Sequence, residues 1–466
     1  MKRALTKAAI MASMITASAP SAPSVAAAQI RGTRARFGTE SGLLVLVEES
    51  HDLPLVDFQI TLRTGSAHDP ADRDGLSRFV ARMIRMGTRN MSAPEVEEQI
   101  DSLGAQLSIE TSPSYTRFAG SVIKRNLDPF MRLMGQLMAR PAFRAADVAQ
   151  VQRETIADII DMRDNDRGLA AKHFREVLFG SHPYGRTVIG LQATVRAVTR
   201  DEVVRHYETH YVASNIVLGL AGDVNEAEAR ALVSRHFGAL RTGAAPPDRV
   251  EPPAERPGRR VRIVDKPDRT QTQIFIGALG SRPLDPDHIA LGVANTAFGG
   301  TFTARLMKEV RSERGWSYGA YSRLGADRQR EAWYMWTFPA ARDAVPCMRL
   351  ELELLERLLT DGITEDELRF AESYLANSFA FDIDTAGERL EQRIEIELLG
   401  LPRDYYDRYV ANVRAVTRDQ ANEALRHHLN AQNLAIVLVA TARDLRPEVA
   451  RLPHVTTVEV LPFDRD

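Results

Sequence analysis

The segment of residues 75–88, GLSRFVARMIRMGT, carries its hydrophobic residues at helical spacing. Apolar side chains recur at i, i+3, i+4, i+7 and i+8, the period of one buried helical stripe; they are Leu76, Phe79, Val80, Met83 and Ile84. The same spacing places Arg78, Ala81, Arg82 and Arg85 on another face. The pattern predicts an amphipathic helix with three guanidinium groups on one side. A solvent-exposed charged face is the ordinary interpretation of such a run.

A repeat divides the chain into two similar units. The heptapeptide VRAVTRD occurs at residues 195–201 and again at 413–419, an offset of 218 residues. An apolar, strand-like run follows each copy, and the asparagines that open these runs, Asn215 and Asn433, keep the same offset. The tandem duplication of one domain is the economical interpretation. Upstream, residues 148–180 correspond to residues 368–400 at an offset of 220.

Short β-rich runs alternate with long helical stretches inside each unit, for example GLLVLVEES, PLVDFQITLRTGS and TQIFIGALGS. This alternation predicts an α+β domain, a mostly antiparallel sheet with helices packed on one face. Residues 241–260 are crowded with proline and charge, which predicts an extended linker. The expected domains are therefore residues 29–240 and 261–466, and together they enclose part of a cavity suited to a substrate.

The first 28 residues have the three-part pattern of a secretory signal peptide. Positive charges open the chain, an apolar run follows at residues 8–17, and a stretch of small residues ends at Ala28. The apolar run is too short to span a bilayer. The pattern predicts cleavage after Ala28 and export of a soluble protein to the periplasm. No other stretch of the sequence resembles a transmembrane segment.

Composition narrows the class of protein further. The 466 residues are 44% hydrophobic and 26% charged, with a formal net charge of −2. This balance gives no reason to expect nucleic acid or an anionic membrane surface as the main partner. The single cysteine, Cys347, excludes an internal disulfide framework and a cysteine-rich metal site.

Several motifs together resemble the insulinase/pitrilysin family of zinc metalloendopeptidases, which includes the mitochondrial processing peptidase. In the first unit they are HDLPLVDFQITLRTGSAHDPADRDGLSRFVARMIRMGT from His51 and FGSHPYGRTVIG from Phe179. In the second unit the motif is FGGTFTARLMKEVRSERGWSYGAYS from Phe298. The resemblance covers essentially the whole chain after the predicted signal peptide.

Active members of that family carry H-x-x-E-H on the helix described first. The two histidines bind zinc, and the glutamate is the general base for the metal-bound water. In this chain those positions are Arg78, Ala81 and Arg82, and the position of the third ligand, a glutamate in the family, is Asp158. Arginine has no lone pair for a metal, and alanine cannot transfer a proton. The resemblance therefore implies a degenerate zinc site, with no metal and no other cofactor in this chain.

An acidic stripe accompanies the third-ligand position. Glu154, Asp158 and Asp161 lie at i, i+4 and i+7 of a predicted helix. Our hypothesis is that Arg78 and Arg82 pair with Asp158 and Asp161, so that an ion-pair cluster replaces the metal. Simple solvation of these charges is the alternative.

The remaining histidines give weaker signals for a metal site. His206 and His210 have the i, i+4 spacing of a ligand pair, but core or surface packing is the better interpretation. His427 and His428 are adjacent, so we do not expect them to face one ligand together on a helix. His51 and His68 fall in turn segments without an acidic residue at a useful spacing.

The second unit keeps the residues that the family uses to bind substrate. In active members an arginine and a tyrosine seven residues apart reach across the cavity; the arginine holds the substrate and the tyrosine hydroxyl stabilises the oxyanion. Arg311 and Tyr318 match this pair, and Gly299 and Gly300 match a flexible glycine-rich loop near the peptide path. Otherwise, Arg311 caps a helix and Tyr318 begins a strand.

This contrast between the two units predicts the function. Some bacterial members of the family are heterodimers of one H-x-x-E-H subunit and one arginine–tyrosine subunit. The resemblance implies that this chain is the second kind, inactive alone, with Tyr318 acting in trans on a peptide held at the zinc of its partner. The alternative is a non-enzymatic peptide-binding or scaffolding homologue. A metal-independent hydrolase has little support, because no histidine lies near Cys347 in the sequence.

Overall fold

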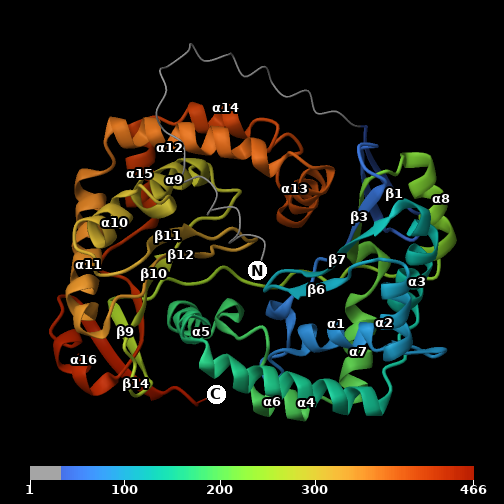
Figure 1. Cartoon of the computed structure of the whole chain (residues 1–466), viewed down its shortest axis with the longest axis horizontal. Helices are drawn as coiled ribbons and strands as arrows, with labels where there is room; N and C mark the ends of the chain where they lie inside the picture. The colour runs from blue at the N-terminus through green and yellow to red at the C-terminus, as the bar shows by residue number, and fades with distance from the viewer. Residues whose placement is uncertain (1–32, 466) are drawn as a thin grey trace. The chain divides into compact units, whose positions relative to one another are not determined.

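The computed structural model describes residues 33–465 (Figure 1). The predicted signal peptide lies outside the described residues. Within residues 33–465, no helix combines the length and the apolar character needed to cross a membrane.

The first of two six-stranded sheets is formed by residues 34–222, with the strand order β1-β2-β8-β3-β7-β6. Only the β2–β8 pair is parallel, so the sheet is mostly antiparallel, as the sequence predicts. The strands are β1 (Arg34–Gly38), β2 (Leu44–Glu49), β3 (Leu55–Leu62), β6 (Ser108–Thr111), β7 (Thr116–Ile123) and β8 (Ile216–Gly222). A separate short hairpin joins β4 (Gly87–Thr88) and β5 (Met91–Ser92).

The second sheet is formed by residues 259–462, with the order β11-β12-β10-β13-β9-β14. Its first three pairs are antiparallel, and β9 runs parallel to both β13 and β14. The strands are β9 (Arg259–Asp265), β10 (Gln273–Leu279), β11 (Ala320–Leu324), β12 (Ala332–Thr337), β13 (Ala435–Ala440) and β14 (Val455–Pro462). The expected α+β class with two mostly antiparallel sheets is confirmed.

Helices fill the remainder of both units. Those before the second sheet are α1 (Leu76–Arg85), α2 (Ala93–Ser102), α3 (Leu127–Ala139), α4 (Ala145–Asp161), α5 (Asp166–Phe179), α6 (Gln192–Ala197), α7 (Arg200–His210) and α8 (Glu226–Phe237). Those after it begins are α9 (His288–Asn295), α10 (Arg305–Met307), α11 (Ala344–Asp361), α12 (Glu365–Ser378), α13 (Ala386–Leu399), α14 (Tyr409–Arg414), α15 (Arg418–His428) and α16 (Ala442–Val449). Two π-helical turns, η7 (Thr296–Gly300) and η8 (Lys308–Ser312), lie on either side of α10.

The repeated heptapeptide has the same structural role in both units. Thr199 and Thr417 are the N-caps of α7 and α15, and each hydroxyl accepts the backbone N–H three residues later, at 3.3 and 3.2 Å. The side chains of Glu202 and Gln420 accept the cap N–H in return, which completes a capping box. The repeat therefore fixes where each of these helices begins.

Each sheet receives a helix from the other unit. In β10, Ile274 and Ile276 belong to the core of the second unit, whereas Phe275 packs against Phe174 of α5. Since alternate residues of a strand point to opposite faces, α5 covers the face that the unit's own core leaves free. The sequence predicts helices on one face only, because a linear pattern does not show which distant helix covers the other.

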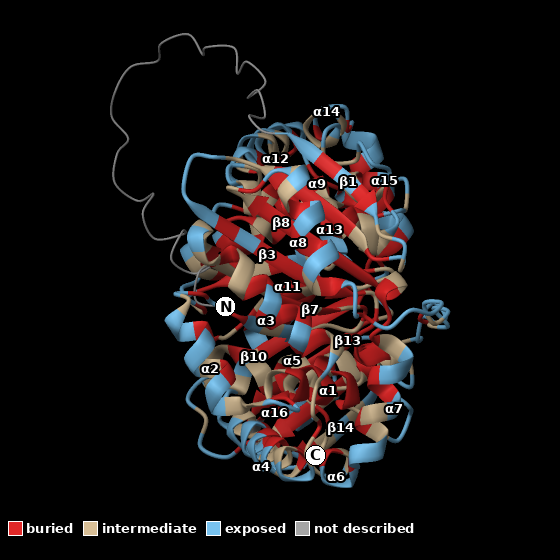
Figure 2. Cartoon of the chain, turned by 90° about the vertical axis from the view of Figure 1, so that its right-hand side faces the viewer, coloured by how far each residue is buried: buried red, intermediate tan, exposed pale blue. Residues whose placement is uncertain are grey.

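The exchange is reciprocal. Leu46 of β2 packs with Leu390 and Ile394 of α13, while Val45 and Val47 face the core of the first unit. Helix α13 thus contacts β2 and β8, just as α5 contacts β9, β10 and β13. The central strands are accordingly buried along most of their length, as Figure 2 shows for β3 and β8.

Polar contacts fix the exchanged helices. Arg393 of α13 donates to the fully buried carboxylate of Glu48 at 3.0 Å, and Arg175 of α5 pairs with Glu331 at 2.7 Å. The two helices also occupy equivalent places in the 220-residue repeat. Each is followed by a glycine with positive φ, Gly180 at 60° and Gly400 at 69°, a conformation that favours glycine.

The stretch between α8 and β9 contains no helix or strand over residues 242–258. It is anchored to both units. Asp248 accepts a hydrogen bond from Arg328 at 2.9 Å, and Arg256 donates to the carbonyl of Val177 at 2.8 Å. The segment is therefore a bound connection and not a free tether.

Candidate functional site

Helix α1 buries the stripe that the sequence predicts: Leu76, Phe79, Val80, Met83 and Ile84 are all at most 3% exposed. The helix begins after Gly75, whose φ is 92°. The buried Asp69 carboxylate accepts the N–H of Gly75 at 3.0 Å and that of Ser77 at 2.8 Å, so it caps the first turn. Burial raises the pKa of Asp69 to about 7. These contacts fix the position of the polar face of α1.

Arg82 is the centre of a cluster between α1 and α4. Its guanidinium donates to Glu154 at 2.8 Å, to the hydroxyl of Thr155 at 2.9 Å and to Asp158 at 3.0 Å. Arg78 approaches the same Asp158 oxygen at 3.6 Å. We call Arg78, Arg82, Glu154 and Asp158 the arginine–carboxylate cluster. Its side chains are partly exposed, from 24% for Arg82 to 46% for Asp158.

The structure answers the pairing hypothesis in two parts. Asp158 does pair with Arg78 and Arg82, as expected. The pairing of Asp161 is wrong: this last residue of α4 is exposed, and within residues 33–465 no side chain pairs with it. Glu154 takes the expected place, because it lies one helical turn before Asp158 on the face of α4 that meets α1.

The cluster does not fit the zinc ion that active members of the family bind at these positions. Arg82 is a permanent cation whose donors already bind the carboxylates that a metal would need. Burial lowers the pKa of Arg78, and the charge of Arg82 lowers it further, yet the group stays far from losing its proton. Ala81 is fully buried. Arg78 and Arg82 therefore cannot hold a metal with its bound water, and Ala81 cannot act as a general base.

The second unit presents a different arginine. Arg311 of η8 lies 4.7 Å from the centre of the Tyr318 ring and 4.4 Å from that of Phe302. These rings are 78% and 60% exposed. Within residues 33–465, neither the Arg311 guanidinium nor the Tyr318 hydroxyl has a hydrogen-bond partner. Tyr318 precedes β11 by two residues, so it is not part of a strand. The arginine–tyrosine pair is an open site with a free donor at its surface.

Gly299 and Gly300 lie in the π-helical turn η7, where the sequence predicts a flexible loop. A β-carbon on Gly299 would come within 2.6 Å of the backbone nitrogen of Ser322 in β11. Only glycine therefore allows η7 to pack this closely on the strand that follows Tyr318. Gly300 has no comparable contact.

Two expectations about histidines are wrong. His427 and His428, at the end of α15, both contact one carboxylate, that of Asp287. The sequence gives no sign of this, because Asp287 lies 140 residues before them. His51 contacts two acidic residues, Asp223 at 2.6 Å and Glu49 at 2.9 Å, through opposite ring nitrogens.

His206 and His210 pack in the interior near the start of α1, in agreement with a packing role. Their rings are 4.4 Å apart, and His206 is 7% exposed. Burial and the neighbouring His210 and His68 hold the pKa of His206 well below its usual value. Burial lowers the pKa of His210 to about 4. Both rings are therefore neutral at pH 7.

Comparison with known proteins gives two family matches in order along the chain. The model described as insulinase (peptidase family M16) matches residues 44–191, and the one described as peptidase M16 inactive domain matches residues 197–375. Both belong to one family, and together they cover more than half of the chain.

Relatives in sequence carry both kinds of description. An uncharacterized zinc protease of Streptomyces coelicolor is 27% identical over 405 residues, which is 85% of this chain and 87% of the relative. A non-peptidase homolog of Helicobacter pylori, YmxG, is 20% identical over 400 residues, which is 86% of this chain and 92% of the relative.

Solved structures establish the same fold. A peptidase M16 inactive domain from Pseudomonas fluorescens superposes with a TM-score of 0.82 at 24% identity, over 88% of this chain and 98% of that one. The periplasmic protease PqqL of Escherichia coli superposes with a TM-score of 0.72 at 18% identity, over 89% of this chain but 48% of PqqL. By sequence and by fold, this chain belongs to the insulinase family of peptidases, family M16.

Proposed function

We propose that this chain is the non-zinc-binding subunit of an exported insulinase-family peptidase. In this proposal it binds the peptide and stabilises the oxyanion for a partner that carries H-x-x-E-H and zinc. The observation that supports it is the difference between two arginines. The Arg82 guanidinium donates its hydrogen bonds to side chains of α4. Arg311 lies against the exposed Tyr318 ring, and both side chains have free donors.

The arginine–tyrosine pair has the chemistry for this role. The Tyr318 hydroxyl donates a hydrogen bond to the oxygen that becomes negative when the scissile carbonyl is attacked. The guanidinium of Arg311 holds a backbone carbonyl or a carboxylate of the peptide with its planar set of donors. Stacking between Phe302 and Tyr318 limits the orientations of this guanidinium and so reduces the entropy lost on binding.

The need for a partner follows from the first unit. The arginine–carboxylate cluster supplies neither a metal ligand set nor a base, so hydrolysis requires both from another chain. The fold of this chain corresponds to about half of PqqL, which is consistent with a site assembled from two such chains. Export rests on the signal-peptide pattern of residues 1–28.

The decisive experiment measures cleavage of a fluorogenic peptide library in the presence of zinc. The mature chain is assayed alone and mixed with an H-x-x-E-H member of the family from the same cell. We expect no activity from this chain alone, activity from the mixture, and a loss of about 10²–10³-fold in kcat with Tyr318→Phe. Tyr374→Phe is the matched control. Tyr374 is also a surface tyrosine, 45% exposed, but it lies on α12 outside the arginine–tyrosine pair.

Each other outcome contradicts a defined part of the proposal. Zinc-dependent hydrolysis by the isolated chain would overturn the account of Arg78 and Arg82. Activity of the mixture that is equal for wild type and Tyr318→Phe would remove the catalytic role. That result would favour the scaffolding alternative. The non-peptidase homolog of Helicobacter pylori is a relative that this alternative fits.

A further inference from the structure

Asp287, His427 and His428 meet where two helices of the second unit pack together. Asp287 is the residue before α9, and the histidines are the last two residues of α15. The two helices contact each other along their length. A carboxylate at the beginning of one helix thus faces two imidazoles at the end of another.

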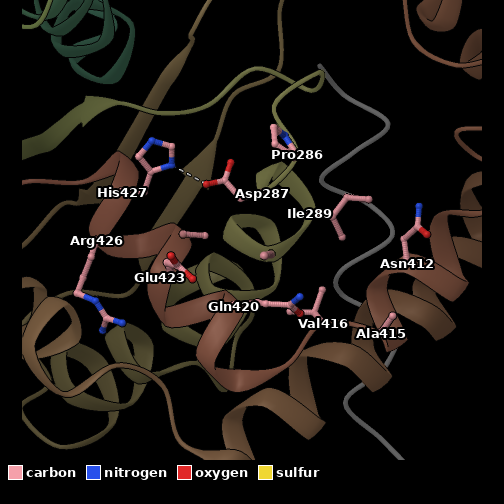
Figure 3. A pocket seen from close by; sticks show the side chains of 12 residues that line it. Pro286, Asp287, Ile289, Asn412, Ala415, Val416, Gln420, Glu423, Arg426 and His427 are labelled. Carbon is pink, nitrogen blue, oxygen red and sulfur yellow. Dashed lines mark hydrogen bonds and ion pairs between the residues drawn. The ribbon is translucent and has the colours of Figure 1, made fainter.

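The three side chains converge on one point. Asp287 Oδ2 lies 2.7 Å from His427 Nδ1, and Asp287 Oδ1 lies 2.8 Å from His428 Nε2. One potential ligand atom from each residue lies within 4.8 Å of both others. Figure 3 shows His427 and Asp287 turned toward each other at the edge of a pocket. Adjacent histidines reach one partner here because the helix ends at His428.

The burial of the three groups differs in a useful way. The His428 side chain is 6% exposed and that of Asp287 25%, whereas that of His427 is 68% exposed. His428 is therefore held in place by the fold, whereas the partly exposed Asp287 and the exposed His427 can shift without disturbing the core. Such an arrangement allows the cluster to expand slightly around an ion.

The ligand set selects a class of metal. Imidazole nitrogen with one carboxylate oxygen suits zinc and neighbouring first-row divalent ions, whereas calcium and magnesium prefer oxygen alone. Zinc–ligand bonds of about 2.0–2.2 Å place tetrahedral ligand atoms roughly 3.3 Å apart. The observed separations of 2.7 and 2.8 Å are about half an ångström shorter, which small rotations of the Asp287 and His427 side chains correct.

Space for further ligands adjoins the cluster. The pocket beside it has a volume of about 890 Å³, and both Asp287 and His427 line it. Glu423 lines the same pocket one helical turn before His427, so its carboxylate is on the same face of α15. Water from this pocket can complete the coordination of an ion held by the three residues.

We propose that Asp287, His427 and His428 form a binding site for one zinc-class divalent cation, separate from the position where the family binds zinc. The bound ion links the end of α15 to the beginning of α9. Helix α9 continues directly into η7, which contains Gly299 and Gly300. The metal therefore stabilises the segment that leads to the arginine–tyrosine pair. This inference does not depend on the proposed function.

Calorimetric titration of the tag-free mature chain with zinc chloride tests the site, with thermal unfolding as the second measurement. We expect one equivalent of zinc to bind and to raise the melting temperature. His427→Ala and Asp287→Asn are each expected to weaken binding more than about tenfold, because one of three protein ligands is lost. His427→Ala retains the fold, since its side chain is largely exposed.

His51→Ala is the matched control. His51 also contacts two carboxylates, but through opposite ring nitrogens, so the three groups cannot share one ion. This variant is expected to bind zinc like wild type, and calcium chloride is expected not to bind at the site. Failure of the wild-type chain to bind zinc, or undiminished binding by His427→Ala, would overturn the proposal and leave Asp287 as a hydrogen-bonded link between two helices.

Discussion

Arg82 and Arg311 carry the same guanidinium group in opposite environments. Arg82 has three hydrogen bonds to side chains of one neighbouring helix, and these occupy donors on both terminal nitrogens. Arg311 has aromatic rings on its faces and no hydrogen-bond partner within residues 33–465. The first arrangement joins two helices, and the second leaves donors available to a ligand. The comparison teaches that the partners of an arginine, more than its place in a family motif, indicate its role.

The largest effect is expected from reversing the first arrangement. The substitutions Arg78→His, Arg82→His and Asp158→Glu place zinc ligands where three side chains already converge. In a His427→Ala background, which removes the other metal site, we expect a zinc dissociation constant of about 1 μM or lower, on the order of −8 kcal/mol. Equilibrium dialysis with zinc analysis measures this gain.

The His427→Ala parent is the control for that experiment and is expected to bind no zinc tightly. If the triple variant is folded but does not bind zinc, the distance between α1 and α4 in this chain does not suit a metal site. The arginine–carboxylate cluster would then reflect a changed backbone and not a simple replacement of ligands.

Acid is expected to destabilise the region around α1, because the buried His206 lies beside Ser77 of this helix. His206 and His210 have pKa values below the ordinary 6.5 in the folded state, so unfolding takes up protons as the pH falls below 6.5. Their contribution to stability is complete above pH 6.5 and is lost toward pH 4. Asp69, with its pKa raised to about 7, acts in the opposite direction over this range.

Replacing His210 isolates one of these contributions. With a folded pKa of about 4, His210 accounts for up to about 3 kcal/mol of stability lost between pH 7 and pH 4. We expect His210→Gln to lose correspondingly less stability than wild type over that range, as measured by urea unfolding at each pH. Parallel curves for the two proteins would mean that the pKa of His210 is the same in the folded and unfolded states.

The smallest effect comes from removing each arginine in turn. Arg82→Ala removes one donor from the buried Thr155 hydroxyl and from each of two half-exposed carboxylates, and we expect a loss of about 2 kcal/mol. Arg311→Ala removes only contacts with exposed rings, for about 0.5 kcal/mol. Urea unfolding of both variants at pH 7 makes the comparison. Equal losses would show that the cluster is no more than a solvated charged face.

Local features of the structure were predictable from the sequence. The buried stripe of α1 follows from its 3.6-residue period, and the duplicated strands and caps follow from the repeat. The pairing of Arg82 with Asp158 follows from the family resemblance alone. Arg82 pairs with Glu154 and not with Asp161 because of where α4 crosses α1. The spacing of the acidic residues along the sequence does not give this crossing point.

Long-range relations were not predictable in the same way. Asp287 meets His427 and His428 only because α9 and α15 pack together. The exchange of α5 and α13 is equally invisible, since Phe174 and Leu390 have the apolar pattern of any packed helix. The π-helical turn η7 packs closely against Ser322 of β11. The glycine pair in the sequence does not indicate this contact.

The exchange of helices has a consequence for the order in which the protein folds during synthesis. All strands of the first sheet have emerged by Gly222, yet the face formed by Leu46, Val217 and Ala221 has no cover until α13 follows, at residues 386–399. An apolar surface thus stays exposed while more than a third of the chain is still to come. The first unit therefore completes its folding only when the second unit supplies α13. Until residue 399 has been synthesised, we expect the exposed apolar face of the nascent chain to bind chaperones.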